Sequence, residues 1–361
     1  MLSLRDALES ALVENPDDLA AHYAYADYLQ EQGDPRGEFI QVQLALEDPQ
    51  RSEAERRKLQ TRAKELLGEN ERAWLGTLVY NPGLEYHFVR GWLDTLIVRD
   101  VGDDVHRADA ELLLYLAPAA RLLRKLILEY DDGLVEAVLR NSPSLRNVQV
   151  FQLGGSRGAM PSSPLLPELI AKLPRIEELR LFAQGYDAAR LFALSNISSL
   201  RILQVYYLND RYPLEVLADN SALRNLTHLL LHPCSFEEPC IDATGIRAIV
   251  HSQHLRNLIH LQLHCSDLGD VGCTEIVTSG ILKRLKILDL RHGEITDTGA
   301  RILADCPDLR RLKLLDIERN ALTQTGINML RRVLGPALRV DNQQTAEELA
   351  QRQYLYEEDF A

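Results

Sequence analysis

The chain has 361 residues, 46% of them hydrophobic, with a formal charge of -13 and a pI near 5.3. This length and hydrophobic content are enough for one large domain or two ordinary domains with a continuous core. The negative charge argues against nucleic acid or an anionic membrane surface as the main partner, because phosphate binding needs a basic surface.

The ends and the cysteines indicate the compartment. The first ten residues contain no apolar signal-peptide core, and the longest apolar run, residues 112–120, is too short to span a bilayer. All five cysteines follow residue 230, and an odd number does not suit a disulfide framework. We therefore expect a cytoplasmic protein with reduced cysteines.

Residues 3 to about 80 are predicted to form helices. Helix starts are indicated at Ser3, at Asp17 or Asp18, at Pro35 and near Gln50. The fourth helix is highly charged, but glutamates lie between its basic residues, so it is predicted to be a solvated face rather than a nucleic-acid patch. Between the second and third helices, we expect a local ion-pair and capping network, with a partner site as the alternative. Its members are Asp27, Asp34, Arg36 and Glu38.

The segment from Tyr25 to Ile40, YADYLQEQGDPRGEFI, carries a specific resemblance. It resembles the core of the small "repeat-companion" domain that precedes leucine-rich repeats in bacterial proteins, although Tyr28 stands where that family more often has Trp. Trp74 and the segment Phe88–Trp92 also resemble the family's junction with the first repeat. The resemblance implies an architecture and brings no catalytic residues.

Residues 258 to 326 repeat one pattern three times in a 27-residue frame. Each copy has the form LxxLxL, then a small or amide residue, then a leucine-like residue, and then a glycine at the start of a helical run. The copies begin at Leu258, Leu285 and Leu312. One such unit cannot bury its own apolar face, so the units must stack. The pattern identifies a leucine-rich-repeat solenoid, and its Thr-Asp-Thr-Gly and Thr-Gln-Thr-Gly segments resemble the ribonuclease-inhibitor-like subfamily.

Earlier frames extend the array. They begin at Leu93, Leu123, Leu145, Ile176, Leu200 and Leu226, which gives about nine repeats. Insertions at 154–167 and 233–242 are expected at the rim of the solenoid. We predict an α/β solenoid with a horseshoe arc and a parallel sheet on its concave face. The predicted domains are an all-α companion domain at 1–80, the repeats at 81–340 and a C-terminal cap at 341–361.

Side-chain alternation predicts which residues leave the core. The leucines point inward, so the third, fifth and seventh positions of each frame face the concave side. The seventh positions contain three successive aromatic residues followed by two histidines, and Tyr207 extends this patch. Such residues favour a partner site, while the alternative is that loops or the N-terminal domain cover them. The predicted partner-binding residues are Phe151, Phe182, Tyr206, Tyr207, His232, His264, Arg291, Asp289, Asp316 and Glu318.

Four histidines form a second group, at His228, His232, His260 and His264. Residues four apart in one strand lie about 13 Å apart, so one four-histidine metal site is excluded, although histidines on adjacent strands could share a metal. Such pairs would need further ligands that the sequence does not supply. We expect the histidines to be a polar, pH-responsive part of an interaction surface, since a histidine pair titrates near neutral pH, and we expect no metal and no cofactor.

The function predicted from these patterns is recognition of a protein partner by a cytoplasmic, non-enzymatic bacterial adaptor. A basic segment of the partner is expected at the acidic C-terminal end of the concave face. One alternative is an inhibitor or activator of a partner enzyme. The other is a metal-dependent hydrolase that uses the four histidines.

Overall fold

The computed structural model describes residues 3–76, 79, 82–99, 120–140, 145–155, 160–206, 211–233, 241–345 and 348. Its strands form a sheet in the order β1 to β11, following the chain. The chain divides into two compact units, which are residues 1–151 with 172–175 (unit 1) and residues 152–171 with 176–361 (unit 2). The predicted domain boundaries at 80 and 340 remain a prediction.

Unit 1 begins with helices whose starts follow the predicted capping signals. Ser3 and Asp6 form a capping box, and the Asp18 side chain accepts a hydrogen bond from the Ala21 amide. A second capping box at Ser52 and Glu55 begins the charged fourth helix. The helices are α1 (Leu4–Glu14), α2 (Leu19–Glu31), α3 (Arg36–Glu47) and α4 (Glu53–Leu75).

The strand of the first repeat forms an antiparallel hairpin with a strand that precedes it, which was not predicted from the sequence. β1 (Leu84–Val89) pairs antiparallel with β2 (Trp92–Val98), and β2 pairs parallel with β3 (Lys125–Leu128). Arg90 and Gly91 turn the hairpin with positive φ angles. Parallel strands are predicted from about residue 93 onward, so β1 is an additional antiparallel strand in front of them. Unit 1 continues with α6 (Leu134–Arg140) and reaches the start of β4 (Val150–Leu153).

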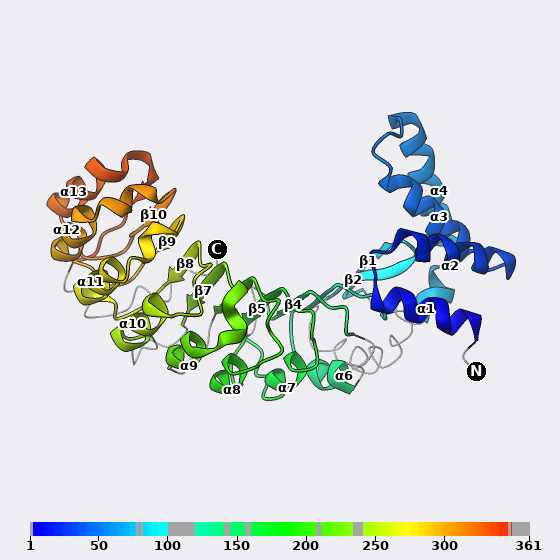
Figure 1. Ribbon diagram of the computed structural model, residues 1–361, viewed down its shortest axis with the longest axis horizontal. Helices are drawn as coiled ribbons and strands as arrows, with labels where there is room; N and C mark the ends of the chain where they lie inside the picture. The colour runs from blue at the N-terminus through cyan, green and yellow to red at the C-terminus, as the bar shows by residue number, and fades with distance from the viewer. Residues whose placement is uncertain are drawn as a thin grey trace. The chain divides into compact units, whose positions relative to one another are not determined.

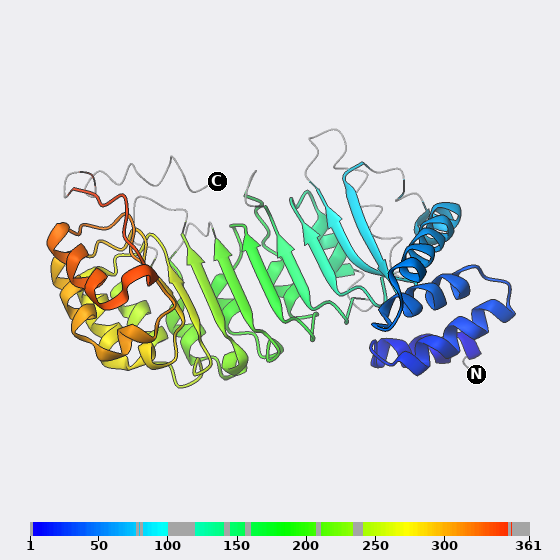
Figure 2. The ribbon, with the colours of Figure 1, turned by 90° about the horizontal axis from the view of Figure 1, so that it is seen from above.

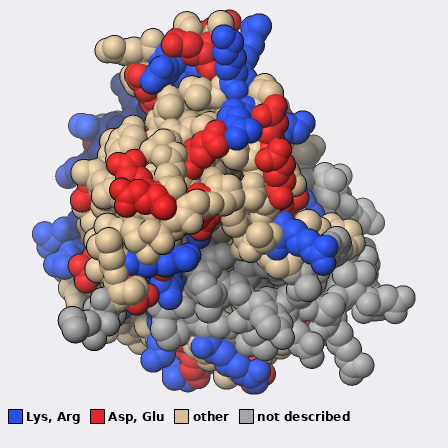
Figure 3. All heavy atoms as spheres, turned by 90° about the vertical axis from the view of Figure 1, so that its right-hand side faces the viewer, with Lys and Arg blue, Asp and Glu red and all other residues tan. Residues whose placement is uncertain are grey.

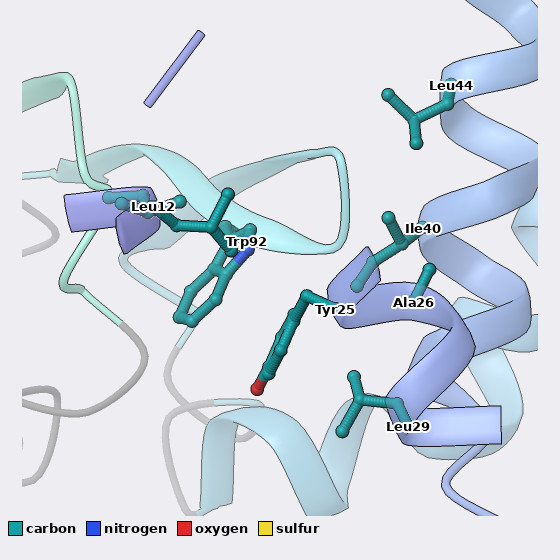
Figure 4. Close-up of a cluster of buried hydrophobic side chains, with 8 residues drawn as sticks. Leu12, Tyr25, Ala26, Leu29, Ile40, Leu44 and Trp92 are labelled. Atoms are coloured by element: carbon teal, nitrogen blue, oxygen red, sulfur yellow. The ribbon is translucent and has the colours of Figure 1, made fainter. Parts of the chain in front are cut away.

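The core of unit 1 joins the helices to the hairpin. Trp92 is 2% exposed and stacks on Tyr25 with ring centroids 5.5 Å apart. The guanidinium of Arg36 lies 4.3 Å from the centre of the Trp92 ring. Figure 4 shows Trp92 and Tyr25 facing each other among Leu12, Leu29 and Ile40.

Unit 2 repeats a strand followed by a helix. Its helices lie along one side of the strands (Figure 1), and the strands lie side by side (Figure 2). The strands are β5 (Glu178–Phe182), β6 (Ile202–Tyr206), β7 (His228–His232), β8 (His260–Leu263), β9 (Ile287–Asp289), β10 (Leu314–Asp316) and β11 (Leu338–Arg339). The helices are α7 (Leu166–Ile170), α8 (Ala188–Phe192), α9 (Leu214–Asp219), α10 (Ala243–His251), α11 (Gly269–Ser279), α12 (Asp297–Asp305) and α13 (Gln324–Leu334).

The leucine positions form the core between strands and helices, as predicted. The six tested positions in the last three complete repeats are all 0% exposed. They are Leu261, Leu263, Leu288, Leu290, Leu315 and Ile317. Burial of these side chains removes apolar surface from water, which is the main force that stacks the repeats.

One predicted frame is wrong by three residues. The amides of Gln149 and Val150 both bond to the Arg124 carbonyl, and in β4 it is Phe151 and Leu153 that are fully buried. The frame therefore begins at Val148 rather than Leu145. Phe151 occupies a leucine position inside the core, so the prediction that it lies on the concave face is wrong.

Carboxylates link successive repeats at the helix starts. Asp270 accepts hydrogen bonds from the Thr296 amide at 3.0 Å and the Gly299 amide at 2.8 Å. Asp297 does the same for Thr323 and Gly326 one repeat later. A Cβ added at Gly299 would lie 2.5 Å from the Asp270 carboxylate, so glycine is needed here for close approach. We call these contacts the carboxylate links.

Buried amide side chains satisfy the turns after the last strands. Asn320 is 0% exposed, accepts from the Gly293 and Ile295 amides and donates to the Leu290 and Ile317 carbonyls. Gln343 stands at the equivalent position after β11 and donates to the Ile317 and Val340 carbonyls. The predicted "small or amide" position thus serves backbone groups that would otherwise be buried without partners.

Candidate functional site

The candidate site is the face of the unit 2 sheet that lies away from the helices, which we call the open face. It is formed by the third, fifth and seventh positions of each frame. Neighbouring strands are in register, so each position forms a row across β5 to β10; for example, Phe182 pairs with Tyr206, and Tyr206 with His232. The side chains of these rows face away from the helices, as predicted.

Most of the predicted partner-binding residues are buried. Phe182, His232, His264, Asp289 and Asp316 are 2–7% exposed. The expectation that they present large exposed surfaces is therefore wrong, and their assignment to a partner site stays a prediction. Tyr206, Arg291 and Glu318 are half-buried.

The rings of the seventh row pack on one another. Ring centroids are 5.4 Å apart between Phe182 and Tyr206, 5.2 Å between Tyr206 and His232, and 5.2 Å between His232 and His264. Gln262 donates to the Tyr206 hydroxyl at 2.6 Å, and burial raises the pKa of Tyr206. This packing makes the row part of the framework of the open face.

A charged cluster ends the row. Nε2 of His264 lies 2.9 Å from Oδ2 of Asp289, and Arg291 donates to the same oxygen at 2.9 Å. Burial lowers the pKa of His264. Burial opposes ionisation of Asp289, but His264 and Arg291 outweigh it and hold its pKa well below the usual range. The cluster therefore contains an ionised carboxylate that its neighbours compensate.

Asp316 is less well compensated. Burial and repulsion from Asp289 raise its pKa to about 6. Its nearest cations are more distant, with Arg291 at 3.7 Å and Arg339 at 3.8 Å. An additional positive group at this end of the open face would therefore favour the ionised form of Asp316.

The histidines form two pairs and no larger group. His228 and His260 have ring centroids 5.4 Å apart, and burial lowers the pKa of each imidazole. Within the described ranges, no group of three or more His, Cys, Asp or Glu side chains could hold a metal ion. The donor set that a metal-dependent hydrolase would need is not assembled there.

The third row is a part of the open face of which the sequence analysis singled out only the two histidines. Its residues pair with one another in register from β6 to β10, and each of them is half-buried. Its members are Ile202, His228, His260, Ile287 and Leu314, and we call them the half-exposed row. The signal was available, because three apolar residues stand at positions that alternation directs out of the core.

Of the four charged residues expected to form a local network between α2 and α3, Asp34 makes the local capping contact and accepts from the Arg36 amide at 2.9 Å, while the charged side chains do not pair with one another. Arg36 donates to the Gly91 carbonyl at 2.7 Å, Glu38 pairs with Arg62 at 2.7 Å, and Asp27 accepts from Gln41. Each contact joins a different element of unit 1. Figure 3 views the side that carries α1–α4, where acidic and basic side chains are interspersed, in agreement with a solvated face.

Some predicted features lie outside the described residues. These are Tyr207, Cys234, Cys240, most of the insertion at 233–242, the centre of the insertion at 154–167 and nearly all of the cap after residue 345. The three described cysteines, Cys265, Cys273 and Cys306, are not in disulfide bonds. Among the described helices, none combines the length and the apolar character that crossing a membrane requires.

Known structures share this fold. No protein-family model matches the chain, and no curated protein matches it in sequence. A protein from Bacteroides fragilis is similar in structure, with a TM-score of 0.53 and 16% identity over 81% of this chain and 86% of that one. An internalin from Listeria monocytogenes has a TM-score of 0.39 and 14% identity over 69% and 72% of the two chains. The plant peptide hormone receptor RGFR1, solved in complex with RGF2, has values of 0.27 and 12% over 64% and 49%. With the repeats and the sheet order, the first likeness establishes the leucine-rich-repeat solenoid fold.

Proposed function

We propose that the open face of unit 2 recognises a protein partner and that the chain is a non-enzymatic adaptor. The half-exposed row carries this proposal. Its five side chains lie on adjacent strands, so at about 4.8 Å per strand they form a line of roughly 19 Å. Apolar side chains in such a line bind a partner by losing their remaining contact with water.

The layer beside the row favours recognition. The rings of the seventh row and the cluster around Asp289 are packed and hydrogen-bonded, so this part of the open face has one arrangement. A rigid surface loses little conformational entropy on binding, which favours affinity. Glu318 and the incompletely compensated Asp316 favour a basic partner segment at the β10 end.

A capture experiment tests the proposal. The full chain, immobilised, is incubated with extract of its native cell, and bound proteins are quantified by mass spectrometry. Ile202→Ser with Ile287→Ser should reduce capture of the partner at least tenfold. The control is Val216→Ser with Val271→Ser, which changes side chains that are 36% and 63% exposed on α9 and α11. Equal capture by both variants would exclude the open face.

An inhibitor or activator of a partner enzyme would use the same face. The two roles differ in the partner's activity, which should be unchanged by an adaptor and changed by a regulator. Assay of the captured partner with and without the chain separates them.

A further inference from the structure

The connections that lead into β6–β10 are strongly basic, although the whole chain carries a charge of -13. These connections are residues 196–201, 220–227, 252–259, 280–286 and 307–313. Together they contain nine basic residues and one acidic residue. All of them lie at the amino ends of parallel strands, so their charges gather along one edge of the unit 2 sheet.

The geometry of this edge places the charges in register. Backbone hydrogen bonds of 2.7–2.9 Å join Arg201 to Thr227, Thr227 to Ile259, Ile259 to Lys286, and Lys286 to Lys313. Adjacent members therefore lie about 4.8 Å apart, and the whole edge spans about 19 Å. We call this line and its flanking cations the basic edge.

Most of these cations have no partner among the residues that the structure describes. Six exposed basic side chains of the basic edge form no ion pair or side-chain hydrogen bond with the rest of the described chain. They are Arg201, Arg224, Lys283, Lys286, Arg310 and Lys313. The one acidic residue, Asp308, pairs with Arg311 at 2.9 Å. Burial and repulsion from Arg256 lower the pKa of Arg284. Like charges have thus been brought together without compensation.

A hollow of about 480 Å³ lies at the β5–β8 end of the basic edge. Arg201, Asn225, Thr227 and Asn257 line it, together with Ser199 and, at the β5 side, Glu177. The Asn225 and Asn257 amide groups donate to backbone carbonyls of the preceding repeat, at 2.8 Å each, which orients both side chains. Their carbonyl oxygens are hydrogen-bond acceptors suited to peptide N–H groups.

We infer that the basic edge binds an acidic segment of a protein partner. A 19 Å line matches about six residues of extended chain. The polar hollow offers acceptors for main-chain amides, and the cations pair with carboxylates. Single-stranded nucleic acid fits less well, because binding to it uses stacking aromatic rings, and the basic edge carries none. This surface is separate from the open face, so the inference does not depend on the function proposed above.

The test uses the full chain and a fluorescein-labelled peptide of six glutamates alternating with serines, with glutamine in place of glutamate as the neutral peptide. Fluorescence anisotropy should show binding of the acidic peptide only, weakening as salt rises. Lys283→Gln, Lys286→Gln and Lys313→Gln combined should weaken binding about tenfold or more. The control removes the same charge from α4 through Arg57→Gln, Lys58→Gln and Lys64→Gln and should change the Kd less than twofold.

Three outcomes would overturn the inference. One is absence of binding to the acidic peptide, and another is an equal loss of binding in the α4 control. The third is tighter binding of a 20-nucleotide single strand or of vesicles containing phosphatidylserine, measured at the same salt concentration, which would assign the edge to another class of partner. Thermal midpoints of both triple variants within about 2 °C of the parent would show that folding is intact.

Discussion

The helices of unit 1 and the last three repeats of unit 2 fix their polar side chains in different ways. In unit 1, Arg36, Glu38 and Gln43 make long-range contacts that differ from one residue to the next, such as Arg36 on Trp92. In the repeats, the contact of Asp270 recurs at Asp297, and that of Asn320 recurs at Gln343. Unit 1 therefore depends on single long-range contacts, whereas the repeats share the same task among equivalent positions. The following variants test this difference.

The largest effect is expected at the centre of unit 1. Trp92→Ala removes the ring that stacks on Tyr25 and supports Arg36, and it should lower the free energy of unfolding by about 3–5 kcal/mol. Denaturant unfolding followed by circular dichroism measures this loss. Trp92→Phe keeps a ring and should recover part of the stability. A loss below about 1 kcal/mol for Trp92→Ala would show that the helices do not depend on this contact.

Replacing a core leucine of a repeat by alanine should lower the free energy of unfolding somewhat less. Leu288→Ala empties a fully buried position between β9 and its helix, with an expected loss of about 2–5 kcal/mol. Leu261 and Leu315 occupy equivalent positions. Leu261→Ala and Leu315→Ala should therefore each lower the free energy of unfolding by an amount within about 1 kcal/mol of the loss for Leu288→Ala in the same assay. Widely different values would contradict the equivalence of the repeats.

Loss of the buried Asn320 amide should have the next largest effect on the free energy of unfolding. Asn320→Ala leaves the Gly293 and Ile295 amides without their acceptor and should cost about 2–3 kcal/mol. The exposed Asn328→Ala on α13 is the matched control and should change the free energy of unfolding by less than about 0.5 kcal/mol. Similar values for both would mean that water replaces the Asn320 contacts.

The carboxylate links should contribute less, and equally. Asp270→Ala and Asp297→Ala each remove acceptors from the start of the following helix, for an expected loss of about 1–2 kcal/mol. Gln324 stands at the same position in the last repeat and is exposed, so Gln324→Ala should be nearly neutral. Thermal unfolding of the three variants ranks them, and a large loss at Gln324 would refute the proposed role of the carboxylates.

The smallest effect should depend on pH. The pKa of Asp316 is about 6 in the folded protein and near 4 when unfolded. The folded state therefore binds more protons between these values, and this residue makes the free energy of unfolding fall as pH rises through that window. Asp316→Asn should be more stable than the parent at pH 8 and should lose this advantage by pH 4. The exposed Asp305→Asn is the control, and matching pH profiles for the two variants would contradict the assignment.

The sequence predicted the fold wherever a pattern repeats. Eight of the nine frames were placed correctly because alternation and stacking give the same answer in each. The ninth was misplaced because Leu145, Val148 and Val150 fit the pattern as well as Val148, Phe151 and Leu153, and only the pairing with β3 decides between them. The β1–β2 hairpin occurs once, so no repetition revealed it.

The candidate site was less predictable. Alternation shows which side of the sheet a residue faces, but it does not show how closely neighbouring rows pack, so the burial of Phe182 and His264 could not be foreseen. The half-exposed row was readable from Ile202, Ile287 and Leu314. The basic edge could also have been predicted, since lysine and arginine recur just before the strands β6 to β10. A total charge of -13 does not show how the charges are distributed.

The carboxylate links make the dependence between neighbours one-sided. Asp270 belongs to one repeat but accepts a hydrogen bond from the first turn of the helix in the next repeat. Asp297 makes the same contact with the helix that follows it by one repeat. Through these links alone, unfolding of a repeat at the C-terminal side costs its predecessor only a partner for a carboxylate, which water solvates well. Unfolding of a repeat at the N-terminal side deprives the next helix of the acceptors for its first amides. The carboxylate links therefore make each helix depend on the repeat before it, whereas Asn320 supplies the opposite dependence, since it accepts from amides of the repeat before its own.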